Sequence, residues 1–413
     1  MTRKFAFAVT AFAVALALGA TAALAGPSTG AADPGVTANS ILLGATTPLS
    51  GPYSSVSSVT IGANAYFKYV NAKGGVLGRQ ITFKYLDDTY NPVQTVQLTR
   101  QLVEQDNVFA IFNSIGTEHN LAVRDYLNAK KVPQLFAASG STALGAEGVK
   151  YPYTIGFQPS YLAEGWVYGK YLARTRPGGR VAVLFQNDDY GKDLLNGLKK
   201  GLQRSKVRVV AAQPYEPSAA DVQSQIAQLK ASGADVFAIF AVGKFPIQAY
   251  VIANKIGWKP KVVVNNIVAS ASNVMTIAGE GGTNKLVNAS IAGVFLKDPN
   301  DPKWQRDAGI AMYRQIMKSY APGANAKDAY HVYGMAVAFT LVEALKKAGK
   351  NLTRDSLVKA VGNLNVTTNP FMVPGVVVKT GPGDHFPIEQ VILQRWNKGS
   401  WRSFGGLWGY RGA

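Results

Sequence analysis

The run from Tyr69 to Pro92, YVNAKGGVLGRQITFKYLDDTYNP, joins a helix end, a strand and an acidic strand exit in one fixed order. Apolar residues recur near helical spacing ahead of Gly74 and Gly75, and a helix end favours a left-handed residue, so a helix is expected to stop at Lys73. Residues 80–86 then alternate between apolar and polar side chains, which is the period of a strand with one buried face. The run therefore predicts a helix followed directly by a strand.

Another strand is predicted ahead of this helix, at Ser40–Thr46. Residues 40–87 would then form one β-α-β unit, whose crossover is right-handed almost without exception. The alternation of strand and helix continues along the chain, which predicts an α/β fold with mostly parallel sheets. Further strands are expected at 108–113, 132–137, 180–185, 207–213, 235–241, 261–265 and 388–396.

Four short motifs in this frame carry a family resemblance. They are LSGP (Leu49–Pro52), NAKGG (Asn71–Gly75), DDTYNP (Asp87–Pro92) and DDYG (Asp188–Gly191). With them the chain resembles the leucine/isoleucine/valine-binding proteins, the periplasmic components of branched-chain amino acid ABC transporters. The resemblance implies a two-lobed type I periplasmic binding fold, in which each lobe is a mostly parallel sheet flanked by helices. Three hinge crossings would join the lobes, which would close on a small molecule.

The crossings set the expected domain boundaries. They are expected near residues 151–165, 290–295 and 372–379, although Pro374 and Gly375 are awkward inside a central strand. The resemblance implies that the helices between the second and third crossings return to lobe one. Lobe one is thus expected at 37–157 and 293–372, and lobe two at 158–292 and 373–413.

The amino terminus has the layout of a secretory signal peptide. Arg3 and Lys4 precede an apolar stretch of about 14 residues, shorter than the roughly 20 needed to span a bilayer, and an A-x-A site follows. Cleavage is expected after Ala25, with residues 26–36 as a leader. The chain has no cysteine, so no lipid can be attached to one at the cleavage site. These features predict a periplasmic protein.

The chain is strongly basic but lacks the pattern of a nucleic-acid-binding protein. Its formal net charge is +19, and removal of Arg3 and Lys4 with the signal leaves +17. The lysines and arginines are scattered instead of gathered around aromatic platforms, which argues against nucleic acid as a partner. The three histidines lack metal-ligand spacing, so no metal and no cofactor is expected.

Ligands of open α/β sheets gather at the carboxyl ends of strands, beside helix amino termini. The loop after the strand at 108–113 is NSIGTEHN, in which Ser114, Gly116 and Thr117 precede a helix. The resemblance implies that this loop binds the carboxylate of the ligand. It also places Gly116 where the family has a serine, so a hydroxyl would have to come from Thr117 or Ser114.

Two further loops of lobe one are candidates for ligand contacts. The loop AASGST after the strand at 132–137 contributes Ala138, Ser139 and Ser141, because the resemblance implies a backbone carbonyl and a hydroxyl there. The first loop, SGPYSSVSS, would place Tyr53, Ser54 and Ser55 at the mouth of the cleft. Where the family usually has a glycine after the tyrosine, this chain has Ser55 and Val56.

Lobe two departs further from the family. The resemblance implies a glutamate and a tyrosine that hold the ammonium group of the ligand. The matching positions fall near Asn266 and near Val242 or Gly243, and no acid is present at either. Because an unpaired buried ammonium is costly, either the Asn265 and Asn266 carbonyls serve or the ligand lacks that group.

The crossing segment QPSYLAEG offers Tyr161 and Glu164 as residues that face the cleft from lobe two. The alternative is an ordinary helix start capped by Ser160.

The predicted function is a periplasmic solute-binding protein that delivers its ligand to an inner-membrane ABC permease. The ligand would be a hydrophobic or branched-chain amino acid or a related apolar or aromatic carboxylate, and the protein is expected to be a monomer. The alternatives are a ligand domain of a sensor or receptor on the same fold, and a secreted hydrolase. No nucleophile elbow or activated nucleophile is evident, so an enzyme is not expected.

Overall fold

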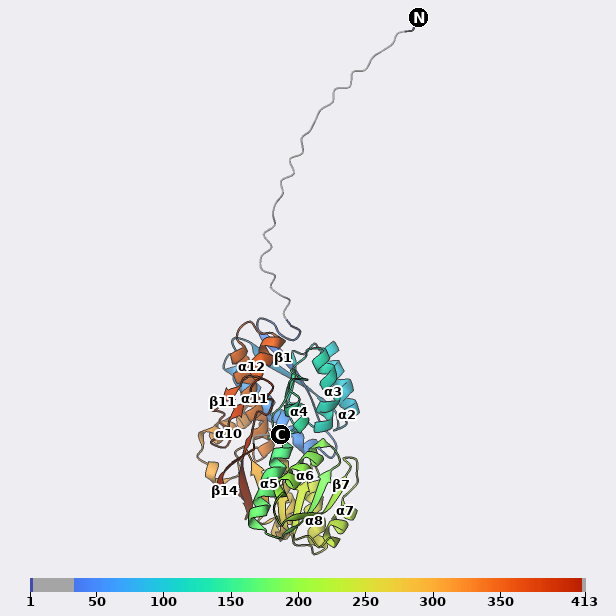
Figure 1. Cartoon of the computed structure of the whole chain (residues 1–413). Coiled ribbons are helices and arrows are strands. Elements are labelled where there is room, and N and C mark those ends of the chain that lie inside the picture. Colours follow the sequence, from blue (N-terminus) through green and yellow to red (C-terminus); the bar gives the residue numbers. More distant parts are fainter. Residues whose placement is uncertain (3–32, 411–413) are drawn as a thin grey trace. The chain divides into compact units, whose positions relative to one another are not determined.

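The computed structural model describes residues 1–2 and 33–410 (Figure 1). All but the first two residues of the predicted signal peptide, and residues 26–32 of the predicted leader, lie outside the described residues. From Asp33 onward the chain forms one compact unit. None of the helices within the described residues combines the length and the apolar character that crossing a membrane would require.

Five parallel strands form the first sheet, in the order β2-β1-β3-β4-β5. The run that ends α1 behaves as predicted: the helix stops at Ala72, and Gly74 and Gly75 have positive φ. The strands are β1 (Ser40–Thr47), β2 (Gln80–Asp87), β3 (Ala110–Phe112), β4 (Gln134–Ala137) and β5 (Thr154–Gly156). The helices are α1 (Ser58–Ala72), α2 (Pro92–Arg100), α3 (Thr117–Ala129) and α4 (Thr142–Ala146). We call the elements around this sheet lobe one.

Seven strands form the second sheet, in the order β14-β13-β10-β9-β8-β6-β7, and we call the elements around it lobe two. Its strands are β6 (Arg180–Gln186), β7 (Arg208–Tyr215), β8 (Val236–Phe240), β9 (Lys261–Val264), β10 (Ile291–Val294), β13 (Gln390–Asn397) and β14 (Ser400–Gly409). Only β13 and β14 run antiparallel to their neighbours among the described strands of this sheet. The helices are α5 (Tyr161–Thr175), α6 (Asp189–Leu202), α7 (Gln223–Ala231), α8 (Phe245–Lys255) and the short α9 (Thr276–Ala278).

Helices α5 and α6 pack with their backbones in close approach, which fixes the start of α5 at the hinge. A Cβ at Gly197 would lie 2.1 Å from the Leu162 carbonyl oxygen, so only glycine allows this distance. Any larger residue at Gly197 would push α5, which carries Tyr161 and Glu164, away from α6.

Three later helices pack against lobe one. They are α10 (Ala308–Tyr320), α11 (Ala329–Ala348) and α12 (Arg354–Val361). The Arg354 side chain donates hydrogen bonds to the Val108 and Phe109 carbonyl oxygens beside β3, at 2.8 and 2.9 Å. The ring of Tyr320 in α10 lies 6.4 Å from that of Tyr69 in α1. These contacts join residues far apart in sequence into one lobe.

The second and third crossings lie side by side. Leu296 and Met372 form an antiparallel bridge, and the Val373 N–H donates to the Phe295 carbonyl oxygen at 3.0 Å. The predicted third crossing at 372–379 contains the short strand β12 (Val378–Lys379), which pairs with β11 (Asn365–Val366). Gly375 has φ of +89°, which is incompatible with a regular strand.

The structure departs from the sequence predictions in three other places. The predicted boundary at residue 373 puts the following turn in lobe two, whereas His385 contacts the Thr154 carbonyl oxygen in lobe one at 2.8 Å. Helix α12 was not predicted, although Thr353 and Ser356 form a capping box at its start. Strand β14 was also not predicted. It follows a tight turn in which Lys398 and Gly399 both have positive φ, the signature of a hairpin.

Candidate functional site

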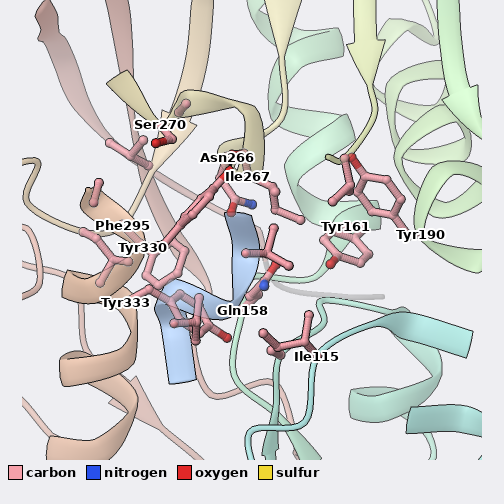
Figure 2. A pocket seen from close by; sticks show the side chains of 18 of the residues that line it. Ile115, Gln158, Tyr161, Tyr190, Asn266, Ile267, Ser270, Phe295, Tyr330 and Tyr333 are labelled. Carbon is pink, nitrogen blue, oxygen red and sulfur yellow. Dashed lines mark hydrogen bonds between the residues drawn. The ribbon is translucent and has the colours of Figure 1, made fainter. Parts of the chain in front are cut away.

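A cavity lies between the lobes, where several loops at strand carboxyl ends meet the hinge (Figure 2). It holds about 960 Å³ free of protein atoms, including its open mouth, and most of its lining is apolar or aromatic. Six of the predicted site residues line it, and they are Gly116, Thr117, Ala138, Tyr161, Val242 and Asn266.

The lobe-one side of the cavity is built at the start of α3. Gly116 has φ of +111°, and a Cβ there would lie 2.2 Å from the His119 ring, so the turn into the helix requires glycine. Thr117 is the first residue of the helix. The N–H groups of a first helical turn have no intrahelical partner, and the helix dipole makes this end attractive to an anion.

Three predicted serines of lobe one support the loops from behind. The Thr46 N–H donates to Ser114 Oγ at 3.0 Å, and the Ser139 hydroxyl lies 2.7 Å from the Thr117 hydroxyl. Ser141 is buried, and its hydroxyl has no hydrogen-bond partner among the described residues. None of the three lines the cavity, whereas Ala138 does.

The first loop closes one end of the site with an aromatic ring. Tyr53 is 3% exposed, and its ring stacks on Tyr90 with centroids 4.0 Å apart. Its hydroxyl donates to the Pro217 carbonyl oxygen of lobe two at 3.2 Å. Tyr53, Ser54 and Ser55 do not line the cavity, which Val56 borders instead.

Two buried tyrosines form one wall of the cavity. The Tyr190 hydroxyl donates to the Ala241 carbonyl oxygen at 3.0 Å, and the Tyr161 ring meets the Tyr190 ring edge-on at 4.9 Å. Figure 2 shows these two rings beside each other. Val242 lies next to them and lines the cavity, whereas Gly243 packs against Tyr53 outside it.

Asn266 follows β9 and lines the cavity from lobe two, and the carboxylate of Glu164 lies behind it. The Asn266 N–H and side-chain amide donate to Glu164 at 2.5 and 2.6 Å. Glu164 is 1% exposed and does not itself line the cavity. Burial raises the pKa of Glu164 to about 7, against the opposing effect of hydrogen bonds from Tyr168 and Asn266. Ser160, the alternative helix cap, makes no side-chain cap hydrogen bond.

The hinge side of the cavity carries aromatic residues and three buried polar atoms that have no hydrogen-bond partner of good geometry among the described residues. Tyr330 and Tyr333 come from the first turns of α11, and Phe295 comes from the second crossing. The Tyr330 hydroxyl donates to the Ile267 carbonyl oxygen at 2.7 Å. These atoms are the Tyr333 hydroxyl, Gln158 Oε1 and Asp298 Oδ2, all of buried residues that line the cavity. Polar groups of this kind are candidates for hydrogen bonds to a ligand.

Two charged residues border the cavity, but one of them is already paired. Lys297 Nζ lies 2.8 Å from Asp307 and 2.8 Å from the Pro370 carbonyl oxygen. Asp298 is buried, and burial raises its pKa to about 6. Its Oδ1 accepts hydrogen bonds from Asn300.

The lobes touch through reciprocal contacts of carboxylates with helix starts. Glu118 of lobe one accepts a hydrogen bond from the Asp189 N–H at the start of α6, at 3.1 Å. Asp193 of α6 accepts one from the Thr142 N–H at the start of α4, at 2.8 Å. With the Tyr53 contact, these bonds hold the lobes together.

Several lining residues were not predicted from sequence. They include Val59, Tyr90, Gln158, Tyr190, Tyr330, Tyr333 and residues 294–298. Tyr90 and Tyr190 lie inside the motifs DDTYNP and DDYG, which therefore contained a signal for the site. Val59 comes from the first turn of α1. The others come from hinge crossings and from α11, whose approach to the cavity depends on the return of the chain to lobe one.

The chain was compared with known proteins. The model of the periplasmic binding protein family matches residues 40–400. Among curated proteins, the chain is 25% identical over 296 residues to Leu/Ile/Val-binding protein homolog 2 of Brucella abortus, covering 70% of this chain and 73% of that protein.

Solved structures show the same fold. A fatty acid ABC transporter substrate-binding protein from Thermomonospora curvata superposes with a TM-score of 0.75 at 22% identity, covering 92% of this chain and 95% of that one. A branched chain amino acid ABC transporter protein from Thermus thermophilus with bound valine superposes with a TM-score of 0.78 at 17% identity, covering 90% and 97%. The predicted two-lobed type I periplasmic binding fold is confirmed.

Proposed function

Because the chain belongs to the periplasmic binding protein family, we propose that it captures a small solute between its lobes and delivers it to an inner-membrane ABC permease. The solute is a hydrophobic or branched-chain amino acid or a related apolar or aromatic carboxylate. The observation that carries this proposal is the interlobe cavity, which is mostly apolar and begins at the amino terminus of α3.

The chemistry of the lining supports an amphipathic ligand. Tyr161, Tyr190, Tyr330 and Phe295 offer ring surface to an apolar or aromatic body. The start of α3 offers unpaired N–H groups and a positive dipole end to a carboxylate. Buried apolar surface contributes about 25 cal/mol per Å², so the rings supply affinity and the helix start supplies orientation.

Closure of the lobes would link binding to delivery. The cross-lobe hydrogen bonds of Tyr53, Glu118 and Asp193 require both lobes to be close together. A ligand that contacts both lobes shifts the population toward this closed form. The permease would then distinguish loaded protein from empty protein by its shape.

The proposal includes a periplasmic location after cleavage behind Ala25 and a monomeric state. The signal layout and the family support the location. No chemical change of the ligand is required, because the named relatives are binding proteins.

The test uses the mature protein, residues 26–413, exported to the periplasm and purified. Native mass spectrometry of the protein as purified would show a ligand retained in the closed cleft. Calorimetry would then measure binding of leucine, phenylalanine, 4-methylpentanoate and benzoate. The expected result is micromolar or tighter binding of at least one of them.

The matched variants place tryptophan inside and outside the cavity. Val242→Trp fills the cavity and should reduce affinity at least about 100-fold, which corresponds to about 2.7 kcal/mol. Val149→Trp alters a side chain that is 85% exposed and should leave affinity unchanged. Absence of binding to every ligand, or equal affinity of the two variants, contradicts the proposal.

A further inference from the structure

The lobe-two side of the cavity has an acid that its local sequence does not reveal. No carboxylate follows β9, where Asn265 and Asn266 stand. The structure brings Glu164 from the first turn of α5 directly behind Asn266, across 102 positions of sequence. The negative charge is therefore one residue removed from the cavity.

The hydrogen bonds around Glu164 fix its role as an acceptor. The Gly293 N–H donates to the Tyr168 hydroxyl oxygen at 2.8 Å, so the Tyr168 proton is directed to Glu164 Oε1, which lies 2.5 Å away. The Asn266 N–H shares this oxygen, and Asn266 Nδ2 donates to Oε2 at 2.6 Å. Each carboxylate oxygen thus accepts from at least one donor.

The same bonds fix the orientation of the Asn266 amide. Only its NH₂ group can serve a carboxylate, because the other end of the amide is an acceptor. Its Oδ1 therefore points away from Glu164, and no described residue donates a hydrogen bond to it. Since Asn266 lines the cavity, this oxygen is available to a ligand.

We propose that Glu164 is a positioning residue that holds the Asn266 amide with its oxygen toward the cavity, so that the site selects ligands carrying an N–H donor there. This inference rests on the proposed function. The ligand class is an α-amino acid with an apolar side chain, in preference to the same carboxylic acid without its amino group.

The charge of the cluster adds to this preference. Among the ion pairs of the described residues, none includes Glu164, so its charge is not neutralised by a neighbouring cation. The titratable groups that interact with it are Tyr168 on its own helix and Tyr190 on α6. Burial raises the pKa of both hydroxyls well above their usual value, so they stay neutral at physiological pH. A ligand ammonium would thus meet the field of this buried carboxylate in addition to that of Asp298, which lines the cavity from the second crossing.

The test compares leucine with 4-methylpentanoate, which has the same carbon skeleton and no amino group. Calorimetry on the mature protein at about pH 8 should show leucine binding at least about tenfold tighter. From about pH 8 to 6, leucine affinity should fall several-fold as Glu164 takes up a proton, while 4-methylpentanoate affinity stays constant or rises. Neither ligand changes its charge in this range.

Two variants separate positioning from simple damage to the fold. The glutamine side chain in Glu164→Gln offers both a donor and an acceptor, so the Asn266 amide can turn around. The preference for leucine should therefore fall at least about tenfold and no longer depend on pH. Tyr168→Phe disturbs the same buried cluster but keeps the carboxylate and the amide, so the preference should survive within about threefold.

Different failures have different meanings. If the protein binds both ligands equally, or binds 4-methylpentanoate more tightly, or if Glu164→Gln keeps the preference and its pH dependence, the inference is overturned while the proposed function stands. The pKa of Asp298, which also lines the cavity, is raised to about 6, so the pH profile of Asp298→Asn is measured as well. If the pH dependence of leucine affinity survives in Asp298→Asn, it belongs to Glu164 even if Glu164→Gln fails to fold, and if it disappears there, the inference is overturned. If no ligand of the panel binds, the proposed function falls, and this inference falls with it.

Discussion

The two sides of the cavity offer different kinds of polar group to a ligand. On the lobe-one side, Gly116 and Thr117 start a helix whose backbone N–H groups face the cavity end. On the lobe-two side, Asn266 presents a side-chain amide backed by the buried Glu164. Both loops follow a parallel strand, yet one side offers donors and the other offers an acceptor. The cavity therefore has a donor end and an acceptor end, which gives it a direction.

That direction matters because a ligand with opposite ends would bind in one orientation. A helix start favours a carboxylate, and an amide oxygen in front of a carboxylate favours an N–H group. The lobe-one side depends on backbone geometry and so resists most side-chain changes. The lobe-two side depends on a single buried charge and so is open to change by one substitution.

The largest expected effect is on the free energy of unfolding, and it comes from the burial of Glu164 on the lobe-two side. The pKa of Glu164 is raised to about 7 in the folded protein from about 4.5 in the unfolded chain, mainly by burial. The folded state therefore binds the proton more tightly, and the stabilisation that is complete below about pH 4.5 is lost as pH rises to about 7. This loss is on the order of 3 kcal/mol in the free energy of unfolding.

Urea unfolding of the unaltered protein and of Glu164→Gln at several pH values measures this effect. The difference between the two free energies of unfolding should change by that amount between about pH 4.5 and 7. Asp188→Asn is the comparison, because Asp188 is another buried acid whose pKa is raised from 3.8 to about 6, so its effect should develop at lower pH, between about pH 4 and 6. A difference that stays constant with pH would show that Glu164 ionises normally.

The next largest effect is expected from a substitution that displaces the start of α3 on the lobe-one side of the cavity. Gly116→Ala adds a Cβ that collides with the His119 ring at a positive φ, so the start of α3 must shift. Ligand affinity should fall at least about 30-fold, which corresponds to about 2 kcal/mol.

Gly51→Ala is the matched control for backbone strain. Gly51 also has positive φ, but nothing lies within 4 Å of an added Cβ. Calorimetry should show an affinity within about twofold of the unaltered protein, with a stability cost of about 1 kcal/mol. Equal affinity loss in both variants would mean that strain, and not the position of α3, controls binding.

A smaller effect concerns the contact that brings the two sides together. Tyr53→Phe keeps the ring stacked on Tyr90 but removes the hydrogen bond to Pro217 of lobe two. Since this bond forms only on closure, affinity should fall about three- to fivefold, or about 1 kcal/mol. Tyr85→Phe is the control, because its hydroxyl has no hydrogen bond to a described residue. If both variants bind alike, the Tyr53 hydroxyl does not stabilise the closed form.

The smallest effect is expected from Asp193, the lobe-two carboxylate that accepts a hydrogen bond from the Thr142 N–H of lobe one. Asp193→Asn keeps an oxygen for the Thr142 N–H but removes the charge, so affinity should fall about two- to threefold. Asp189→Asn changes an exposed carboxylate on the same helix and should have no effect on affinity. A loss of affinity that is equally large in both would point to the net charge of the helix end instead of the specific contact.

Much of the fold could be predicted because local patterns agree with it. Alternating apolar residues in β2 and a glycine pair after α1 set the period and the end of these elements. Strand β14 was not predicted, because the pattern of β13 was complete as a strand by itself. The turn at Lys398 and Gly399 was therefore not taken as the start of a hairpin. Helix α12 was missed because it is short and its cap is the main signal.

The candidate site was predictable only in part. The loops after β3 and β4 follow directly from strand ends, so Gly116, Thr117 and Ala138 were found. Tyr330 and Tyr333 could not be placed without knowing that α11 packs at the hinge. Ser114 and Ser139 belong to the right loops, but their side chains turn to neighbouring loops, which sequence spacing does not reveal.

The sequence by itself determined the order of strands and helices and the loops at their ends, because these depend on periodicity and on turn residues close in the chain. The tertiary structure alone decided what the lobe-two side offers a ligand. Glu164 and Asn266 are 102 residues apart, and only the packing of α5 beside β9 puts the carboxylate behind the amide. A hydrogen bond between distant residues leaves no local pattern, so the sequence offered Glu164 as a cleft residue, and only the tertiary structure placed its carboxylate behind the Asn266 amide.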